Sequence, residues 1–188
     1  MKRLWLLACV LALVAVPSWA SGVGAGIGFW DTADAEDDNG LAMKLVFDVG
    51  KKWNVDFRAS FFDGHGLMSG PRKISIEATP IDLGISYDFQ TKGKVTPYVG
   101  GGLNYTLYKS GVDNLLTGLT ETSRIKDEPG WYVLVGIDVP IHNRIAFYVE
   151  GIFRQNKPTV QGDGLASFGQ IPVDFAGAGA TLGLAYTW

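Results

Sequence analysis

The chain has 188 residues but only one cysteine, Cys9, and two histidines, His65 and His142. A lone cysteine makes neither an internal disulfide nor a thiolate metal site, and two distant histidines do not form a ligand or nucleophile–base pattern. Charged residues make up 19% of the chain, the formal net charge is −3, and basic residues form no long run. We therefore expect no cofactor, metal or catalytic residues, no enzymatic activity and no nucleic-acid partner.

A long apolar run is also missing. Residues 4–16 are apolar, but this stretch is shorter than the roughly twenty residues of a membrane-spanning helix. It follows Lys2 and Arg3 and precedes Pro17-Ser18-Trp19-Ala20, an order typical of a secretory signal peptide. We expect residues 1–20 to be a signal cleaved after Ala20, and residues 21–188 to form one domain. A lipoprotein cut before Cys9 would leave too short an apolar region.

Glycine, with 25 residues, and apolar residues, at 47%, are abundant. After residue 20 the apolar residues alternate with glycine or polar residues, as in Val23-Gly24-Ala25-Gly26-Ile27-Gly28-Phe29. Alternation with a period of two is typical of β-strands with two different faces. Eight such strands are predicted: 23–29, 43–49, 53–61, 81–89, 99–107, 131–139, 145–153 and 176–188.

The links between these segments alternate in length. Links near 50–52, 90–94 and 140–144 are short, whereas the polar segments at 31–40, 63–73, 109–129 and 155–174 are long. Outer-membrane barrels have an even number of strands, short periplasmic turns and longer external loops. The predicted fold is therefore an all-β, eight-stranded antiparallel up-and-down transmembrane β-barrel in the bacterial outer membrane, with both termini periplasmic.

A soluble barrel of the lipocalin kind also has about eight alternating strands, but its larger apolar side chains fill the interior. Here one face carries phenylalanine, leucine, isoleucine and valine almost without charge, and the other mixes charges with glycine. Glycines such as Gly84, Gly100 and Gly136 on the mixed face give no apolar mass for a core, but they suit a narrow, crowded lumen. The mixed face is therefore predicted to point inward and the apolar face toward lipid.

The inward face carries a set of charged residues that we interpret as a lumen polar network. An eight-stranded lumen is just wide enough to be filled by side chains, so ion pairs can close it. A polar constriction that gates a solute is the alternative interpretation. The predicted network consists of Lys44, Asp48, Asp56, Arg58, Asp82, Asp88, Asp138, Tyr148, Glu150 and Arg154.

Counting back from the short links predicts which inward residues lie opposite one another. We expect Arg58 and Arg154 to be the positive centres of the network. The predicted opposite pairs are Asp48 with Asn54, Lys44 with Arg58, Gly136 with Tyr148, and Leu134 with Glu150.

Four tryptophans fall at predicted strand ends: Trp30, Trp53, Trp131 and Trp188. Amphipathic aromatic rings gather where the membrane meets water, so we interpret these four as interfacial aromatics. Strict alternation, however, points Trp30 inward.

Three further features are predicted, one at the start of a strand and two in the long links. The alternation changes phase before Ile81, which indicates a bulge or register break near Pro80. The link 109–129 contains an apolar cluster, which we expect to form a short helix that caps the barrel; an exposed ligand patch is the alternative. The acidic segment 31–38 lacks EF-hand spacing, so a solvated loop is expected there rather than a calcium site.

The segment Pro97-Tyr98-Val99-Gly100-Gly101-Gly102-Leu103-Asn104-Tyr105-Thr106 closely resembles a strand of the OmpW family of small outer-membrane barrels. The strand 81–89 and the stretch 126–138 are similar to that family as well, so the resemblance covers the middle third of the chain. Elsewhere the chain resembles only the broader class that includes OmpX and opacity-type proteins.

This resemblance implies a narrow conduit for small hydrophobic solutes. It also implies that the barrel-assembly machinery recognises the C-terminal strand, which ends in the aromatic residue Trp188. The other partners expected are outer-membrane lipid and lipopolysaccharide. A closed barrel with an envelope-stabilising or surface-adhesion role remains the alternative function, because a charged lumen is a poor path for an apolar molecule.

Overall fold

The computed structural model describes residues 21–32, 38–69, 72–89, 94–114, 120–121, 123–125, 128–157, 159–162, 171–172 and 176–188. Each of the eight predicted alternating segments corresponds to one long strand. These strands are β1 (Gly22–Thr32), β2 (Asp38–Asp48), β3 (Trp53–Ser69), β4 (Arg72–Asp88), β5 (Thr96–Asn114), β8 (Glu128–His142), β9 (Ile145–Gln155) and β12 (Gly177–Thr187).

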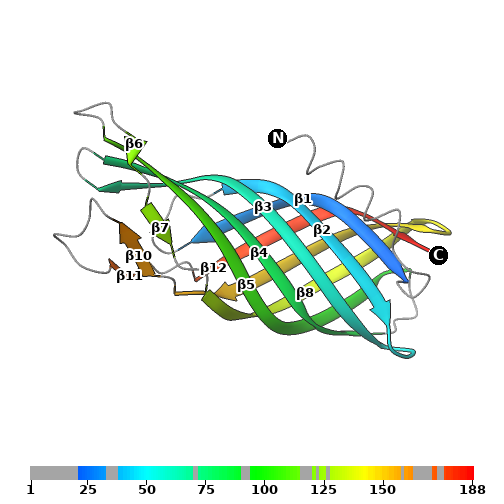
Figure 1. Cartoon of the computed structure of the whole chain (residues 1–188). Coiled ribbons are helices and arrows are strands. Elements are labelled where there is room, and N and C mark those ends of the chain that lie inside the picture. Colours follow the sequence, from blue (N-terminus) through cyan, green and yellow to red (C-terminus); the bar gives the residue numbers. More distant parts are fainter. Residues whose placement is uncertain are drawn as a thin grey trace.

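The eight strands form a closed barrel (Figure 1). Neighbours pair in the order β4-β3-β2-β1-β12-β9-β8-β5, and a further pairing of β4 with β5 closes the ring. All these pairings are antiparallel. The predicted eight-stranded antiparallel barrel is therefore confirmed. Among the described residues there is no helix of the length and apolar character needed to cross a membrane.

The two ends of the barrel differ. One end carries the links 49–52, 89–95 and 143–144, and also the first and last described residues, Ser21 and Trp188. We call it the short-turn end and the opposite one the long-loop end. Strands β3, β4 and β5 have 17, 17 and 19 residues, whereas β1, β2, β9 and β12 have 11 each. The long strands extend beyond the others at the long-loop end (Figure 1).

Two of the predicted long loops are largely strand. Residues 63–69 and 72–73 belong to β3 and β4, and residues 109–114 extend β5. The predictions of irregular loops at these positions are wrong. Strands pair through their backbones, so a strand that extends beyond the lipid needs no apolar side chains on its outer face. These strand ends are largely polar and show no alternation in the sequence.

A small second sheet lies at the long-loop end. It pairs β11 (Ile171–Pro172), β10 (Thr159–Gly162) and β7 (Ser123–Ile125), while β6 (Thr120–Glu121) pairs with β5. The predicted helical cap within 109–129 is therefore wrong for the described part of that segment, which is extended. Its residues 115–119 lie outside the described residues, as do residues 33–37 of the acidic segment.

The irregularity predicted near Pro80 takes a different form. Strand β4 keeps one register with β5 along its whole length. Its register with β3 is the same on both sides of Pro80, although the pairing is interrupted at Thr79 and Pro80, as expected for a residue without an N–H. The register shift lies instead in β3, between Asp63 and His65. An interruption of the ladder at Pro80 is thus confirmed, whereas a register break in β4 itself is not seen and that part of the prediction is wrong.

The hairpin of β8 and β9 also differs from the prediction, whereas the pairs Asp48 with Asn54 and Lys44 with Arg58 are confirmed. The turn contains only residues 143–144, and the register shifts between Pro140 and His142. As a result, the ladder is displaced by two residues from the predicted one. The observed pairs are Gly136 with Glu150, Leu134 with Ile152, and Asp138 with Tyr148.

The outward face is the apolar one, as predicted. Large apolar side chains such as Ile27, Leu83, Leu103, Val135 and Leu184 are exposed along the strands. In a membrane these side chains face lipid, so their exposure is favourable there. Trp53, Trp131 and Trp188 also lie on this exposed surface, and their interfacial role remains a prediction.

Trp30 does not belong to that set. Only 1% of its surface is exposed, its ring packs against Phe62 with centroids 5.4 Å apart, and the Arg154 guanidinium lies 5.7 Å from its ring centroid. Its position two residues after Gly28 puts it on the inward face. The assignment of Trp30 as an interfacial aromatic is therefore wrong, because the alternation of β1 continues through it.

Inward-facing tyrosines lie opposite glycines on the neighbouring strand. The observed pairs are Tyr98 with Gly136, Tyr132 with Gly102, and Tyr148 with Gly183. A Cβ at Gly136 would lie 2.6 Å from the Cε2 and Oη atoms of Tyr98, and one at Gly183 would lie 2.8 Å from the Oη of Tyr148. Glycine thus makes room for a large ring in a lumen of fixed width.

We expect Gly136→Ala to lower the free energy of unfolding by about 1 to 3 kcal/mol, because the added methyl group would overpack the lumen against a fixed ring. Gly151→Ala is the matched control, since a Cβ there would have Val135 Cγ1 as its nearest neighbour, at 3.8 Å. Urea titration of the membrane-inserted protein, followed by tryptophan fluorescence, measures both. Equal midpoints for the two variants would contradict this packing.

Candidate functional site: the polar lumen

The lumen contains the residues that alternation placed there, at different depths. Asp48 is exposed at the short-turn end, and Asp88 and Asp138 are partly exposed. The buried members are Lys44, Asp56, Arg58, Asp82, Tyr148, Glu150 and Arg154.

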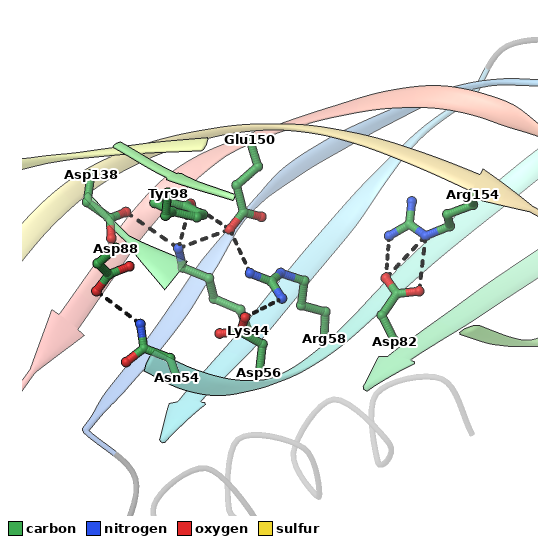
Figure 2. Close-up of polar contacts among 10 residues, drawn as sticks. All are labelled: Lys44, Asn54, Asp56, Arg58, Asp82, Asp88, Tyr98, Asp138, Glu150 and Arg154. Atoms are coloured by element: carbon green, nitrogen blue, oxygen red, sulfur yellow. Dashed lines mark hydrogen bonds and ion pairs between the residues drawn. The ribbon is translucent and has the colours of Figure 1, made fainter. Parts of the chain in front are cut away.

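Glu150 is the centre of one cluster of contacts (Figure 2). Its Oε1 atom accepts hydrogen bonds from Tyr98 Oη at 2.7 Å, and from Lys44 Nζ and Arg58 NH2 at 3.2 Å each. The four residues come from β9, β5, β2 and β3. One carboxylate therefore ties together strands that lie on different sides of the lumen.

Both cations in this cluster also have a second acidic neighbour. Arg58 NH1 lies 3.2 Å from Asp56, and Lys44 Nζ lies 3.5 Å from Asp138. Lys44 Nζ is also 3.8 Å from the ring centroid of Tyr148, a distance at which a cation is attracted to the ring face. We call this group the central cluster; it comprises Lys44, Asp56, Arg58, Tyr98, Asp138, Tyr148 and Glu150.

A second cluster lies nearer the long-loop end, because Arg154 is four residues further along β9 than Glu150. Arg154 NH2 contacts Asp82 Oδ2 at 2.7 Å and its Nε donates to the same atom at 3.1 Å. Asp82, which has 0% exposure, also accepts a hydrogen bond from Asn104. We call this group the loop-side cluster; it comprises Asp82, Asn104, Thr106, Arg154 and Asn156, with the two asparagines and the threonine hydrogen-bonded to one another.

Next to the loop-side cluster the lumen is lined by a group that we call the aromatic layer, which consists of the aromatic residues Trp30, Phe62 and Tyr108 together with Ala78, all buried. Trp30 lies beside Arg154, whereas Phe62, Ala78 and Tyr108 lie further toward the long-loop end on β3, β4 and β5. Ala78 of β4 lies opposite both Phe62 and Tyr108. Along β3, β4 and β5, the described lumen thus passes from aromatic to polar in the direction of the short-turn end.

The lumen is open at the short-turn end. A cavity of about 200 Å³ opens there, lined among others by Ser21, Asp48, Asp88 and Asp138. Between the two clusters a cavity of only about 10 Å³ remains, the space of a single water molecule. Little space therefore remains between the two clusters.

The structure places eight of the ten predicted network residues in two clusters, with Arg58 in one and Arg154 in the other. Asp88 and Asp48 belong to neither cluster and accept hydrogen bonds from Asn54 and Ser21 instead. Reasoning from charge missed the neutral partners Tyr98, Asn104, Thr106 and Asn156. Alternation carried the signal for the first three, because they share the inward face of β5. Asn156 follows the end of β9, where no alternation indicates its direction.

The lumen is built for ion pairing rather than for metal binding. Among the described residues no group of three or more histidine, cysteine, aspartate or glutamate side chains is placed to hold a metal ion. The acids of both clusters instead contact arginine or lysine. Each of these carboxylates therefore has a positive side chain next to it.

A closed antiparallel barrel with an apolar outer surface and a polar interior defines a small integral membrane β-barrel. The chain belongs to the family described as outer membrane protein beta-barrel domain, whose model matches residues 6–187. The protein is therefore an outer-membrane protein, and the expected kinship with small outer-membrane barrels of the OmpW and OmpX kind is confirmed.

Solved structures with the same fold include OprG from Pseudomonas aeruginosa. That likeness has a TM-score of 0.78 at 18% sequence identity, and covers 90% of this chain and 95% of OprG. Neisserial surface protein A gives a TM-score of 0.62 at 16% identity, over 89% of this chain and 96% of that one. AlkL in lipid bilayers gives 0.55 at 19% identity, over 89% and 90%.

Curated relatives include the dibenzothiophene metabolism operon protein PahQ from Pseudomonas aeruginosa. It is 27% identical over 121 residues, which cover 56% of this chain and 57% of PahQ. The dibenzothiophene metabolism operon protein DoxH from Pseudomonas sp. (strain C18) gives the same values. The chain thus spans a little over half the length of the curated relatives it matches.

We expect Arg58→Ala and Arg154→Ala each to lower the free energy of unfolding by about 3 to 5 kcal/mol, because Asp56 and Asp82, respectively, would each lose the cation that contacts its buried carboxylate. Lys51→Ala, in the exposed link 49–52, should change it by about 0 to 1 kcal/mol. Urea titration in detergent or lipid vesicles measures all three. Unchanged midpoints for both arginine variants would mean that the clusters are hydrated rather than desolvated.

Proposed function

We propose that the protein is a non-enzymatic conduit that takes up small hydrophobic solutes at its long-loop end. The curated relatives PahQ and DoxH are named for an operon of dibenzothiophene metabolism. Dibenzothiophene is an apolar aromatic molecule, and the outer membrane is the first barrier to its entry. Both this connection and the resemblance to the OmpW family favour a hydrophobic solute.

The observation that carries the proposal is the order of the layers in the lumen. Of the described lumen side chains on β3 to β5, an apolar molecule entering from the long-loop end would meet Tyr108 and Phe62 before Asp82, and aromatic side chains bind aromatic solutes favourably. Beyond them it would meet the Arg154–Asp82 pair and then Glu150 with its cations. An apolar molecule cannot replace these buried ionic contacts, and separating them would leave charges unpaired. The proposed path therefore does not follow the barrel axis to the short-turn end.

A second candidate function is a closed barrel that stabilises the envelope or presents its loops to other surfaces. The filled lumen favours this function as well, because two layers of ion pairs rigidify the barrel. Neither candidate involves catalysis. His65 lies in β3 toward the long-loop end and His142 lies at the short-turn end, so the two histidines do not share a site.

We infer that the short-turn end faces the periplasm, since a signal peptide and short turns at the same end are typical of outer-membrane barrels. The apolar outer surface then lies in lipid and lipopolysaccharide. The exposed aromatic residue Trp188 at the end of the last strand supports recognition by the barrel-assembly machinery.

The proposal predicts solute uptake without ion conduction. Cells or proteoliposomes that carry the protein should take up dibenzothiophene faster than matched samples without it. Planar bilayers with the same protein should show no steady single-channel current, because the two clusters close the axis. Equal uptake with and without the protein would reject the conduit and leave the closed barrel, whereas a large stable current would reject the plugged lumen.

The aromatic layer can be tested with two adjacent residues of one strand. Phe62 is buried in the lumen, while Phe61 is exposed on the outer face. Phe62→Ala should slow dibenzothiophene uptake about 2- to 10-fold, since an aromatic contact is worth about 0.5 to 1.5 kcal/mol. Phe61→Ala should leave uptake unchanged. Equal effects of the two substitutions would contradict a role for the inner layer, with heat-modifiable gel migration confirming that both variants fold.

A further inference from the structure

Ser21 is held at the junction between the first and last strands. Its backbone N–H donates to the carbonyl of Val46 at 2.8 Å, and its own carbonyl accepts from the N–H of Trp188 at 3.3 Å. The next residue, Gly22, lies opposite both Val46 and Thr187. The position of the Ser21 nitrogen is therefore fixed from both sides at the short-turn end.

The side chain of Ser21 is bound to Asp48. The Ser21 hydroxyl donates to Asp48 Oδ1 at 2.7 Å, and the Asp48 N–H donates back to the same hydroxyl oxygen at 3.0 Å. Among the residues that the structure describes, the Asp48 carboxylate contacts this hydroxyl but no cation. Asp48 is thus an ordered carboxylate that lacks a positive partner in the described part of the chain.

The surroundings of Ser21 are acidic. The cavity at the short-turn end is lined by Asp48, Asp56, Asp88 and Asp138, and its cations are Lys44 and Arg58. Both cations are already bound to Glu150. A further positive charge at the mouth would therefore be stabilised.

We propose that cleavage of the signal after Ala20 supplies this charge, with the new α-ammonium group of Ser21 as the cation that partners Asp48. The inference depends on the predicted cleavage site and is independent of the proposed conduit. Hydrolysis of the Ala20–Ser21 peptide bond takes up one water molecule, leaving a carboxylate on Ala20 and an ammonium group on Ser21. The reaction thus converts a neutral amide into a cation at a position that the barrel already holds in place.

The geometry suits this role. The Ser21 nitrogen is three covalent bonds from the hydroxyl oxygen that binds Asp48. As an amide it has one hydrogen, which the Val46 carbonyl accepts. As an ammonium group it has two more, which are free to point toward the Asp48 carboxylate. Processing would thereby join the ends of β1 and β2 next to the closing strand β12, and the processed barrel would be more stable than the unprocessed one.

The first experiment fixes the site of processing. The full-length chain is exported in a Gram-negative host, the barrel is purified from the outer membrane, and its intact mass is measured. We expect the mass of a chain that begins at Ser21. A chain beginning at any other residue overturns the proposal, because its ammonium group would not lie at this position.

The second experiment tests the contact itself in that purified protein. The α-amine is acetylated near neutral pH, where it reacts before the lysines because its usual pKa of about 7.7 to 8.0 lies well below theirs. Acetylation should lower the urea midpoint of the wild type and change that of Asp48→Asn clearly less. Asp31→Asn, which makes the same change at the other end of β1, should respond like the wild type. An unchanged midpoint after acetylation, or an equal shift in Asp48→Asn, overturns the proposal.

Discussion

The hydrogen-bonding requirement of the backbone inside a membrane determines the rest of this structure. Lipid offers no partner for N–H and C=O groups, so an extended chain is stable there only when every strand has a neighbour on each side. The pairings of β1 with β12 and of β4 with β5 meet this requirement. Once the ring is closed with eight strands, its circumference is set, and so is the width of the space inside it.

That narrow space explains the composition of the inner face. Several large rings lie where the opposite residue is glycine, as for Tyr98 against Gly136. Charges enter only with partners, since the lumen between the aromatic layer and the short-turn cavity has little room for water. In the described part of the chain, the lumen is occupied by side chains of the strands themselves. A hydrophobic solute would accordingly use the aromatic end of the lumen and avoid its ionic centre.

Sequence predicted those parts of the fold on which lipid imposes a pattern. The eight strands and the direction of their faces follow from alternation, because a lipid-facing position must be apolar. The extensions of β3, β4 and β5 escaped prediction because they lie where both faces of a strand can be polar. The displaced β8–β9 ladder escaped it as well, since a bulge at Pro140 leaves no mark on the alternation of either strand.

Sequence largely predicted which side chains point into the lumen, but it did not predict which of them contact one another. Lys44 and Arg58 occupy the opposite positions that counting from the turn predicts. Arg58 also lies directly opposite Asp82, yet it binds Glu150 while Asp82 binds Arg154. Long side chains reach across the lumen to strands that are not neighbours, and strand register alone does not specify such contacts. Trp30 shows that alternation outweighs residue type. Alternation along β1 correctly predicts that its side chain points inward, whereas its being a tryptophan suggested an interfacial position.

The central cluster has a consequence for how the chain folds. Lys44 and Glu150 are 106 residues apart in sequence, whereas each hairpin joins strands that are close in sequence. Contacts over such distances form late, after the entropy of closing the intervening chain has been lost. Hairpins can therefore assemble while the charges of the future lumen are still hydrated at the membrane surface. Desolvation of those charges then coincides with ring closure, so a chain that closes in a wrong register would bury unpaired ions and reopen rather than persist as a misfolded barrel.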